Sequence, residues 1–88
     1  MIVEEAVDLG EGHQIEFGRA TWNEDRRSVR NRYPTASGGF SPHSSSEIPI
    51  EDVVPMAIET LRRNLLDPQL ALQIAAAAIE SARRRLAE

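Results

Sequence analysis

Apolar and polar residues alternate over residues 13–22, which predicts a β-strand. Ile15 and Phe17 point to one side of this strand, and Glu16 points to the other. A second alternating stretch covers residues 27–33. We expect the two stretches to pair as an antiparallel hairpin, with the polar segment 23–25 as its turn.

The second stretch separates two kinds of side chain. Val29 and Tyr33 share one face with Arg27, and Arg30 and Arg32 project together from the other face. Pro34 lacks a backbone N–H, so we expect it to end the strand pairing.

Residues 1–9 fit two structures. Val3, Val7 and Leu9 would share one side of a strand, whereas Val3, Ala6 and Val7 would share one face of a helix. The segment 10–12 contains two glycines and is typical of a turn. We favour a strand, because a hairpin with residues 13–22 then follows naturally.

Residues 34–47 show no periodicity and are rich in Gly, Ser and Pro, which predicts a loop. A helix is expected to begin near Pro49 or Glu51, with Pro55 in its first turn. Asn64 is expected to close this helix. Its expected buried stripe consists of Val54, Ile58, Leu61 and Leu65.

A second helix is expected after Asp67, as N-cap, and Pro68, at the first helical position. The short connection predicts that the two helices pack as an antiparallel pair. Small side chains in the run 75–78 would let another helix approach closely. The expected oligomer interface repeats at three- and four-residue intervals and consists of Leu72, Ala75, Ile79, Ala82 and Leu86.

Together these elements predict an α+β fold: a small antiparallel sheet of two to three strands, followed by an antiparallel pair of C-terminal helices. We expect a single domain over residues 1–88. It would consist of a sheet at 1–34, a Gly/Ser loop at 35–48 and a helical hairpin at 49–88.

The composition of the chain argues against several classes of protein. The net charge is −4, which argues against a protein that binds duplex nucleic acid through a broad basic surface. The chain has no cysteine, no expected signal peptide and no long apolar run, so we expect a cytoplasmic protein without a membrane partner. A chain this short, without disulfides, favours stabilisation by homo-oligomerisation.

All ten basic residues are arginines, and four of them lie in the strand that leads into the Gly/Ser loop. Arginine binds phosphate and carboxylate with paired hydrogen bonds, glycine N–H groups can face an anion, and aromatic rings can stack on a base. We therefore predict a site for a small anionic, nucleotide-like ligand. Its expected contacts are Arg27, Arg30, Arg32, Tyr33, Gly38, Gly39, Phe40, Ser44 and Ser45.

A plainer alternative is that the arginines balance the acidic first strand and that the glycines form an ordinary surface loop. Catalysis has weaker support, since His43 next to Ser44 does not orient a nucleophile and base. His13 and His43 lack the close spacing of metal ligands. We expect no enzyme activity, no metal and no cofactor.

Residues 30–33, 38–42 and 44–49 read Arg-Asn-Arg-Tyr, Gly-Gly-Phe-Ser-Pro and Ser-Ser-Ser-Glu-Ile-Pro. Here the chain resembles the phage Thoeris anti-defence proteins of the first type, over residues 12 to about 60. Those proteins are oligomeric sponges that sequester a cyclic ADP-ribose isomer without degrading it, and some members also hold cyclic oligonucleotides. The resemblance implies ligand contacts at Arg30, Arg32, Phe40 and the nearby loop.

The leading hypothesis is therefore a non-enzymatic oligomer that sequesters a small phosphorylated or cyclic nucleotide signal in a host cytoplasm. The alternative is a small protein-interaction module of the antitoxin, immunity or inhibitor type, which would use the Ala-rich last helix.

Overall fold

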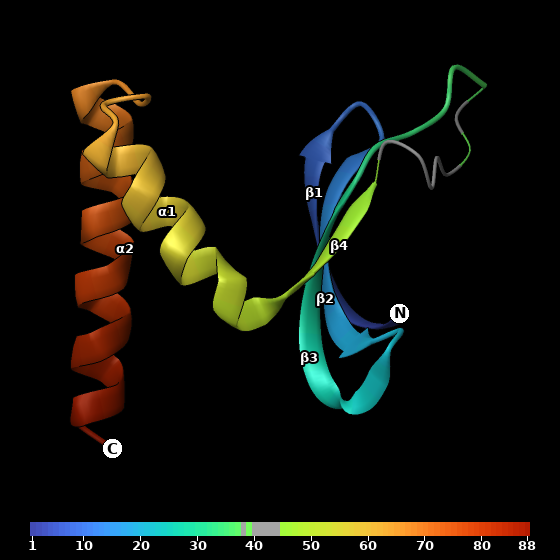
Figure 1. Cartoon of the computed structure of the whole chain (residues 1–88), viewed down its shortest axis with the longest axis horizontal. Coiled ribbons are helices and arrows are strands. Elements are labelled where there is room, and N and C mark those ends of the chain that lie inside the picture. The colour runs from blue at the N-terminus through green and yellow to red at the C-terminus, as the bar shows by residue number, and fades with distance from the viewer. Residues whose placement is uncertain (38, 40–44) are drawn as a thin grey trace. The chain divides into compact units, whose positions relative to one another are not determined.

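The computed structural model describes residues 1–37, 39 and 45–88, and it has an α+β fold (Figure 1). It divides into two compact units, residues 1–53 and residues 54–88, which we call the sheet unit and the helical unit. The elements in chain order are β1 (Ile2–Gly10), β2 (His13–Ala20), β3 (Asn23–Arg32), β4 (Ser46–Pro49), the 3-10 helix η1 (Ile50–Asp52), α1 (Val53–Arg62) and α2 (Pro68–Leu86).

The four strands form one antiparallel sheet in the order β1-β2-β3-β4. The strand expected over residues 1–9 is confirmed, and the turn that follows it has positive φ angles at Gly10, Glu11 and Gly12. The expected count of two to three strands is wrong, because β4 pairs with β3 inside the segment expected to be a loop. The expected turn at 23–25 is also wrong, because β3 begins at Asn23 and the turn lies at Thr21 and Trp22.

Gly18 in β2 is required by the close approach of β1. A Cβ atom at this position would lie 1.9 Å from the backbone oxygen of Ile2. The two strands can therefore pair at this point only because residue 18 has no side chain.

The sheet unit is unusual in what it buries. Its most buried described side chains are Ser28, Ala20, Glu16 and Ser45, and three of these four are polar or charged. Every buried side-chain nitrogen or oxygen among the described residues has a hydrogen-bond partner. Hydrogen bonds and ion pairs thus replace the usual apolar contacts on this face of the sheet.

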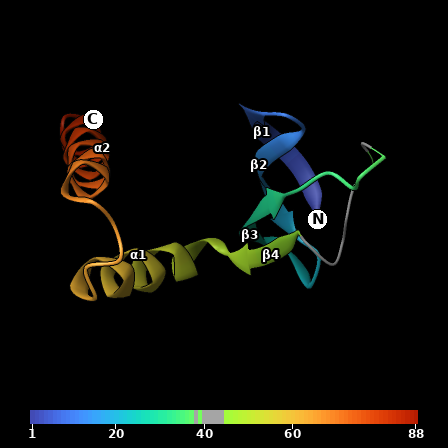
Figure 2. The ribbon, with the colours of Figure 1, turned by 90° about the horizontal axis from the view of Figure 1, so that it is seen from above.

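The helical unit confirms two helices near the predicted positions, joined by residues 63–67 (Figure 2). Pro55 lies in the first turn of α1, and Asn64 has a positive φ of 55° where the helix ends. Pro68 is the first residue of α2.

The predicted burial of the α1 stripe is wrong for three of its four residues, because Val54, Ile58 and Leu65 are 59%, 41% and 70% exposed. The predicted antiparallel packing of α1 against α2 is wrong, because the two helices scarcely contact each other and neither has a fully buried residue.

Candidate functional site: an arginine pair beside the loop

Arg30 and Arg32 act on the same carboxylate. The register places Glu16 of β2 opposite Arg30 of β3, and Glu16 is only 3% exposed. Arg30 approaches the Glu16 Oε1 atom with its Nε at 2.8 Å and its Nη2 at 2.7 Å, and Arg32 Nη1 lies 3.2 Å from Oε2. The two guanidinium groups are therefore fixed next to each other, on the shared face that strand alternation predicted.

Arg32 also lines a hollow of about 200 Å³, together with Gly12, Gln14, Pro34 and Gly39. Gly39 is held there by Thr35: the Gly39 N–H donates to Thr35 Oγ1 at 2.9 Å, and the Thr35 N–H donates to the Gly39 carbonyl at 2.6 Å. Two of the predicted ligand residues, Arg32 and Gly39, thus meet in one concave surface.

An aromatic pair lies next to this hollow along the chain, but strand alternation places it on the face of the sheet opposite Arg30 and Arg32. The rings of His13 and Tyr33 stack with centroids 4.3 Å apart and planes 8° from parallel. His13 Nε2 hydrogen-bonds the side-chain oxygen of Asn31, and Asn31 Nδ2 donates to the Tyr33 hydroxyl at 3.3 Å. Tyr33 is 41% exposed, so the pair presents a flat, preoriented aromatic surface.

Ser45 has an internal role. It is 8% exposed, and its hydroxyl oxygen accepts the Tyr33 backbone N–H at 3.0 Å. This hydrogen bond joins Ser45, just before β4, to Tyr33, just after β3. The remaining predicted contacts, Gly38, Phe40 and Ser44, lie outside the described residues.

The structure does not bring Arg27 together with Arg30 and Arg32. Arg27 lies on the other face of β3, where its Nη1 atom is 2.6 Å from Glu4 Oε1. Arg19 Nε lies 3.4 Å from the other oxygen of Glu4. The contact of Arg27 with Glu4 agrees with the plainer interpretation, in which the arginine neutralises the negative charge of the acidic first strand.

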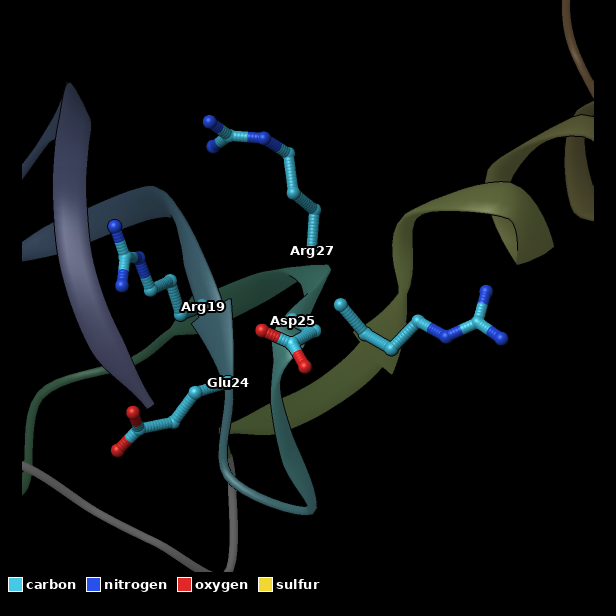
Figure 3. A pocket seen from close by; sticks show the side chains of 5 residues that line it. Arg19, Glu24, Asp25 and Arg27 are labelled. Atoms are coloured by element: carbon cyan, nitrogen blue, oxygen red, sulfur yellow. The ribbon is translucent and has the colours of Figure 1, made fainter.

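Two further hollows include Arg27. One, of about 410 Å³, is lined by Glu4, Glu5, Phe17 and Arg27. The other, of about 270 Å³, is lined by Arg19, Glu24, Asp25, Arg26 and Arg27, and Figure 3 shows the guanidinium groups of Arg19 and Arg27 on one side of the hairpin. Both hollows mix the two signs of charge, so neither is a simple anion site.

Sequence reasoning missed Glu47, which ties β4 to the β2–β3 hairpin. One of its carboxylate oxygens accepts the Thr21 N–H and the Ser28 hydroxyl, both at 2.9 Å, and the other accepts the Thr21 hydroxyl at 2.7 Å. Partial burial alone would raise the pKa of Glu47, but the hydrogen bonds from Thr21 and Ser28 outweigh it and lower the pKa from 4.5. The ionised carboxylate therefore stabilises the position of β4.

Sequence reasoning also missed Glu16, Gln14 and Gly12 at the site. Strand alternation places Glu16 and Gln14 on one face of β2, but their positions opposite Arg30 and Arg32 depend on the register of the hairpin. The acidic residue in the strand that precedes the arginine strand was the available signal.

The predicted interface residues of α2 are all exposed, and Leu72, Ile79 and Leu86 are 68%, 54% and 86% exposed. Ala75 and Ala82 are the remaining two. Within the described residues, no helix has the length and apolar character needed to cross a membrane. Across the same residues, no three His, Asp or Glu side chains are grouped so that they could hold a metal ion.

Comparisons with protein-family models, with curated proteins and with solved structures found no match to this chain.

Proposed function

We propose that this chain is a non-enzymatic, oligomeric protein of a host cytoplasm that sequesters a small phosphorylated or cyclic nucleotide signal. The Thoeris anti-defence proteins, which the chain resembles, act in this way. The observation that carries the proposal is the meeting of Arg32 and Gly39 in one hollow.

The chemistry of these groups suits such a ligand. A guanidinium group binds phosphate oxygens with paired hydrogen bonds. Glu16 holds the guanidinium groups of Arg30 and Arg32 in place before a ligand arrives, which lowers the entropy lost on binding.

The size of the hollow favours a shared site. Pockets that enclose a drug-sized ligand usually measure about 300–1,000 Å³, whereas the described hollow measures about 200 Å³. It has room for one phosphate or one ring, so we expect the rest of the ligand to contact the loop and a second subunit.

Isothermal titration calorimetry with cyclic ADP-ribose isomers and cyclic dinucleotides tests the proposal. We expect one of them to bind, and we expect Arg32→Gln to weaken binding at least tenfold, since it removes a charge-assisted contact worth about 1.5–3 kcal/mol. The matched control is Arg62→Gln, which changes an exposed arginine of α1.

Arg32→Gln is preferred over a change at Arg30, because Arg30 alone provides the two closest contacts to the buried Glu16. A folded protein that gives no heat with any of these nucleotides would contradict the proposal. So would equal binding by the Arg32 and Arg62 variants.

Sequestration also predicts that the bound nucleotide is released unchanged. Chromatography of the ligand after long incubation and heat denaturation of the protein should recover only the starting compound. Conversion that disappears in the Arg32→Gln variant would instead identify an enzyme.

A protein-interaction module is the second candidate, and the exposed large apolar side chains of α2 favour it. In that case a partner protein would be retained from a host lysate, and Leu72→Glu or Ile79→Glu would abolish its capture. The Arg32→Gln variant would capture the same partner as the unaltered chain.

A further inference from the structure

The helix α2 has more exposed apolar surface than one neighbour can cover. Its large side chains Leu70, Leu72, Ile74, Ile79 and Leu86 are between 37% and 86% exposed. At about 100° per residue, these side chains and the alanines between them cover an arc of about 200°. A stripe of about 100° is enough to face a single packed layer, so α2 has apolar surface for two.

The large side chains form two rows along the helix. Leu70 and Ile74 lie on one edge of the apolar arc, and Leu72, Ile79 and Leu86 lie on the other. The floor between the rows consists of the small residues Ala71, Ala75, Ala78 and Ala82. A second helix can seat on this floor, between the two rows, with its axis about 8 Å away.

We propose that the occupant is α2 of a second copy of this chain, packed antiparallel about a two-fold axis near the Ala75–Ala78 run. In this arrangement Ala75 of one copy lies at the level of Ala78 of the other, and Ile74 lies at the level of Ile79. The contact is self-complementary, as a two-fold interface requires.

Charge selects the antiparallel direction. The last turn of α2 contains Arg83, Arg84 and Arg85, and Asp67 precedes its first turn. A parallel pair would gather six guanidinium groups at one end. The antiparallel pair instead places Asp67 of each copy beside Arg85 of the other, and both residues lie on the same edge of the alanine floor.

The charged residues of this end are available for such a contact. Arg83 makes no ion pair among the described residues, whereas Arg84 pairs with Glu80 at 3.0 Å and Arg85 with Glu88 at 3.6 Å in its own helix. All of these side chains are exposed, so they can exchange partners at low cost.

This inference deepens the oligomeric part of the proposed function. It does not depend on the ligand, because its test is read on the protein alone. Loss of nucleotide binding with an intact α2 pair would refute the ligand proposal only, and the reverse result would refute only this interface.

Single-cysteine cross-linking tests the arrangement, since the chain contains no native cysteine. In the antiparallel pair, the two Ala75 Cα atoms lie about 6 Å apart, within disulfide range, and the two Leu86 Cα atoms lie about 28 Å apart. We expect Ala75→Cys to form a covalent dimer under mild oxidation. We expect no dimer from Leu86→Cys or from the control Ala76→Cys, which is on the opposite side of the helix.

Each other outcome overturns the proposal. A cross-linked Leu86→Cys dimer beside an Ala75→Cys dimer would show a parallel pair. No cross-link at either position would show that two copies of α2 do not meet at Ala75.

A charge exchange provides a second, independent test. Asp67 makes no side-chain capping bond, so Asp67→Arg should leave the helix intact while it places like charges together at both ends of the pair. We expect the dissociation constant of the dimer, measured by sedimentation, to rise about tenfold. We expect the double variant Asp67→Arg/Arg85→Asp to restore the original dissociation constant. An unchanged dissociation constant for Asp67→Arg would contradict the antiparallel contact.

Discussion

The sheet unit and the helical unit differ in which side chains they bury. The sheet unit encloses Glu16, Ser28 and Ser45, each with hydrogen-bond partners, whereas the helical unit fully buries none of its apolar side chains. The stability of the sheet therefore depends on contacts inside one chain. The helices, by contrast, expose the apolar surface that normally becomes a core, so their stability depends on whatever covers it.

This difference bears on the proposed function. A face lined with paired charges is costly as a core but useful as a binding surface, because its guanidinium groups are already oriented. Exposed apolar helices are costly for a monomer but useful for assembly. The comparison predicts that polar substitutions act mainly on the sheet unit and that protein concentration acts mainly on the helical unit.

The largest effect should come from Glu16→Ala. This change removes the buried carboxylate that contacts both Arg30 and Arg32, at a cost of about 3 kcal/mol. Urea unfolding followed by circular dichroism measures the loss. Glu59→Ala, which breaks the exposed ion pairs of Glu59 with Arg62 and Arg63, is the matched control and should change the free energy of unfolding by less than about 1 kcal/mol. An equal decrease in unfolding free energy for the two variants would contradict the proposed difference between the sheet unit and the helical unit.

Gly18→Ala should have the next largest effect. The new methyl group would meet the backbone of Ile2, so β1 must move away from β2 at a cost of about 2 kcal/mol. Amide hydrogen exchange should show faster exchange in β1 and β2 and unchanged exchange in α2. Unchanged protection across β1 would mean that the two strands are not this close.

Glu47→Gln tests the fastening of β4 and should cost about 1 kcal/mol at neutral pH. Because the folded pKa of Glu47 is lowered, its stabilisation is fully present above its ordinary value of 4.5 and is lost as the pH falls through the folded pKa. The difference in unfolding free energy between Glu47→Gln and the unaltered chain should therefore shrink below pH 4.5. A difference that stays constant from pH 7 to pH 3 would refute the role of the charge.

Glu80→Ala should have the smallest effect, a few tenths of a kcal/mol, because it removes only the exposed pair with Arg84. Thermal unfolding at several protein concentrations measures it. The same experiment should show a melting temperature for the helices that rises with protein concentration. Helices that melt at one temperature over a hundredfold concentration range would be stable without a partner.

The strands that the sequence revealed are those with visible alternation. The pattern around Ile15 and Phe17 identified β2, and the same rule correctly placed Arg30 and Arg32 on one face. The strand β4 escaped detection because its four residues, at the end of a Gly- and Ser-rich segment, contain one large apolar side chain, Ile48. Its formation depends on pairing with β3 and on the Glu47 contacts, which are not local properties of the chain.

The arrangement of the candidate site was predictable in part for the same reason. Residue type identified Arg32 and Gly39, but their meeting with Gly12 and Gln14 depends on the hairpin register and on the path of the loop. The buried stripe expected on α1 failed because periodicity shows which face is apolar and not what covers it.

Native mass spectrometry of the protein purified from cells tests the account most directly, since one spectrum reports both subunit count and bound small molecules. We expect a dimer or a larger even-numbered assembly that carries a nucleotide, and we expect Arg32→Gln to lose the nucleotide while it keeps the assembly. A monomer without bound ligand, from protein whose circular dichroism shows it to be folded, would contradict both parts of the account.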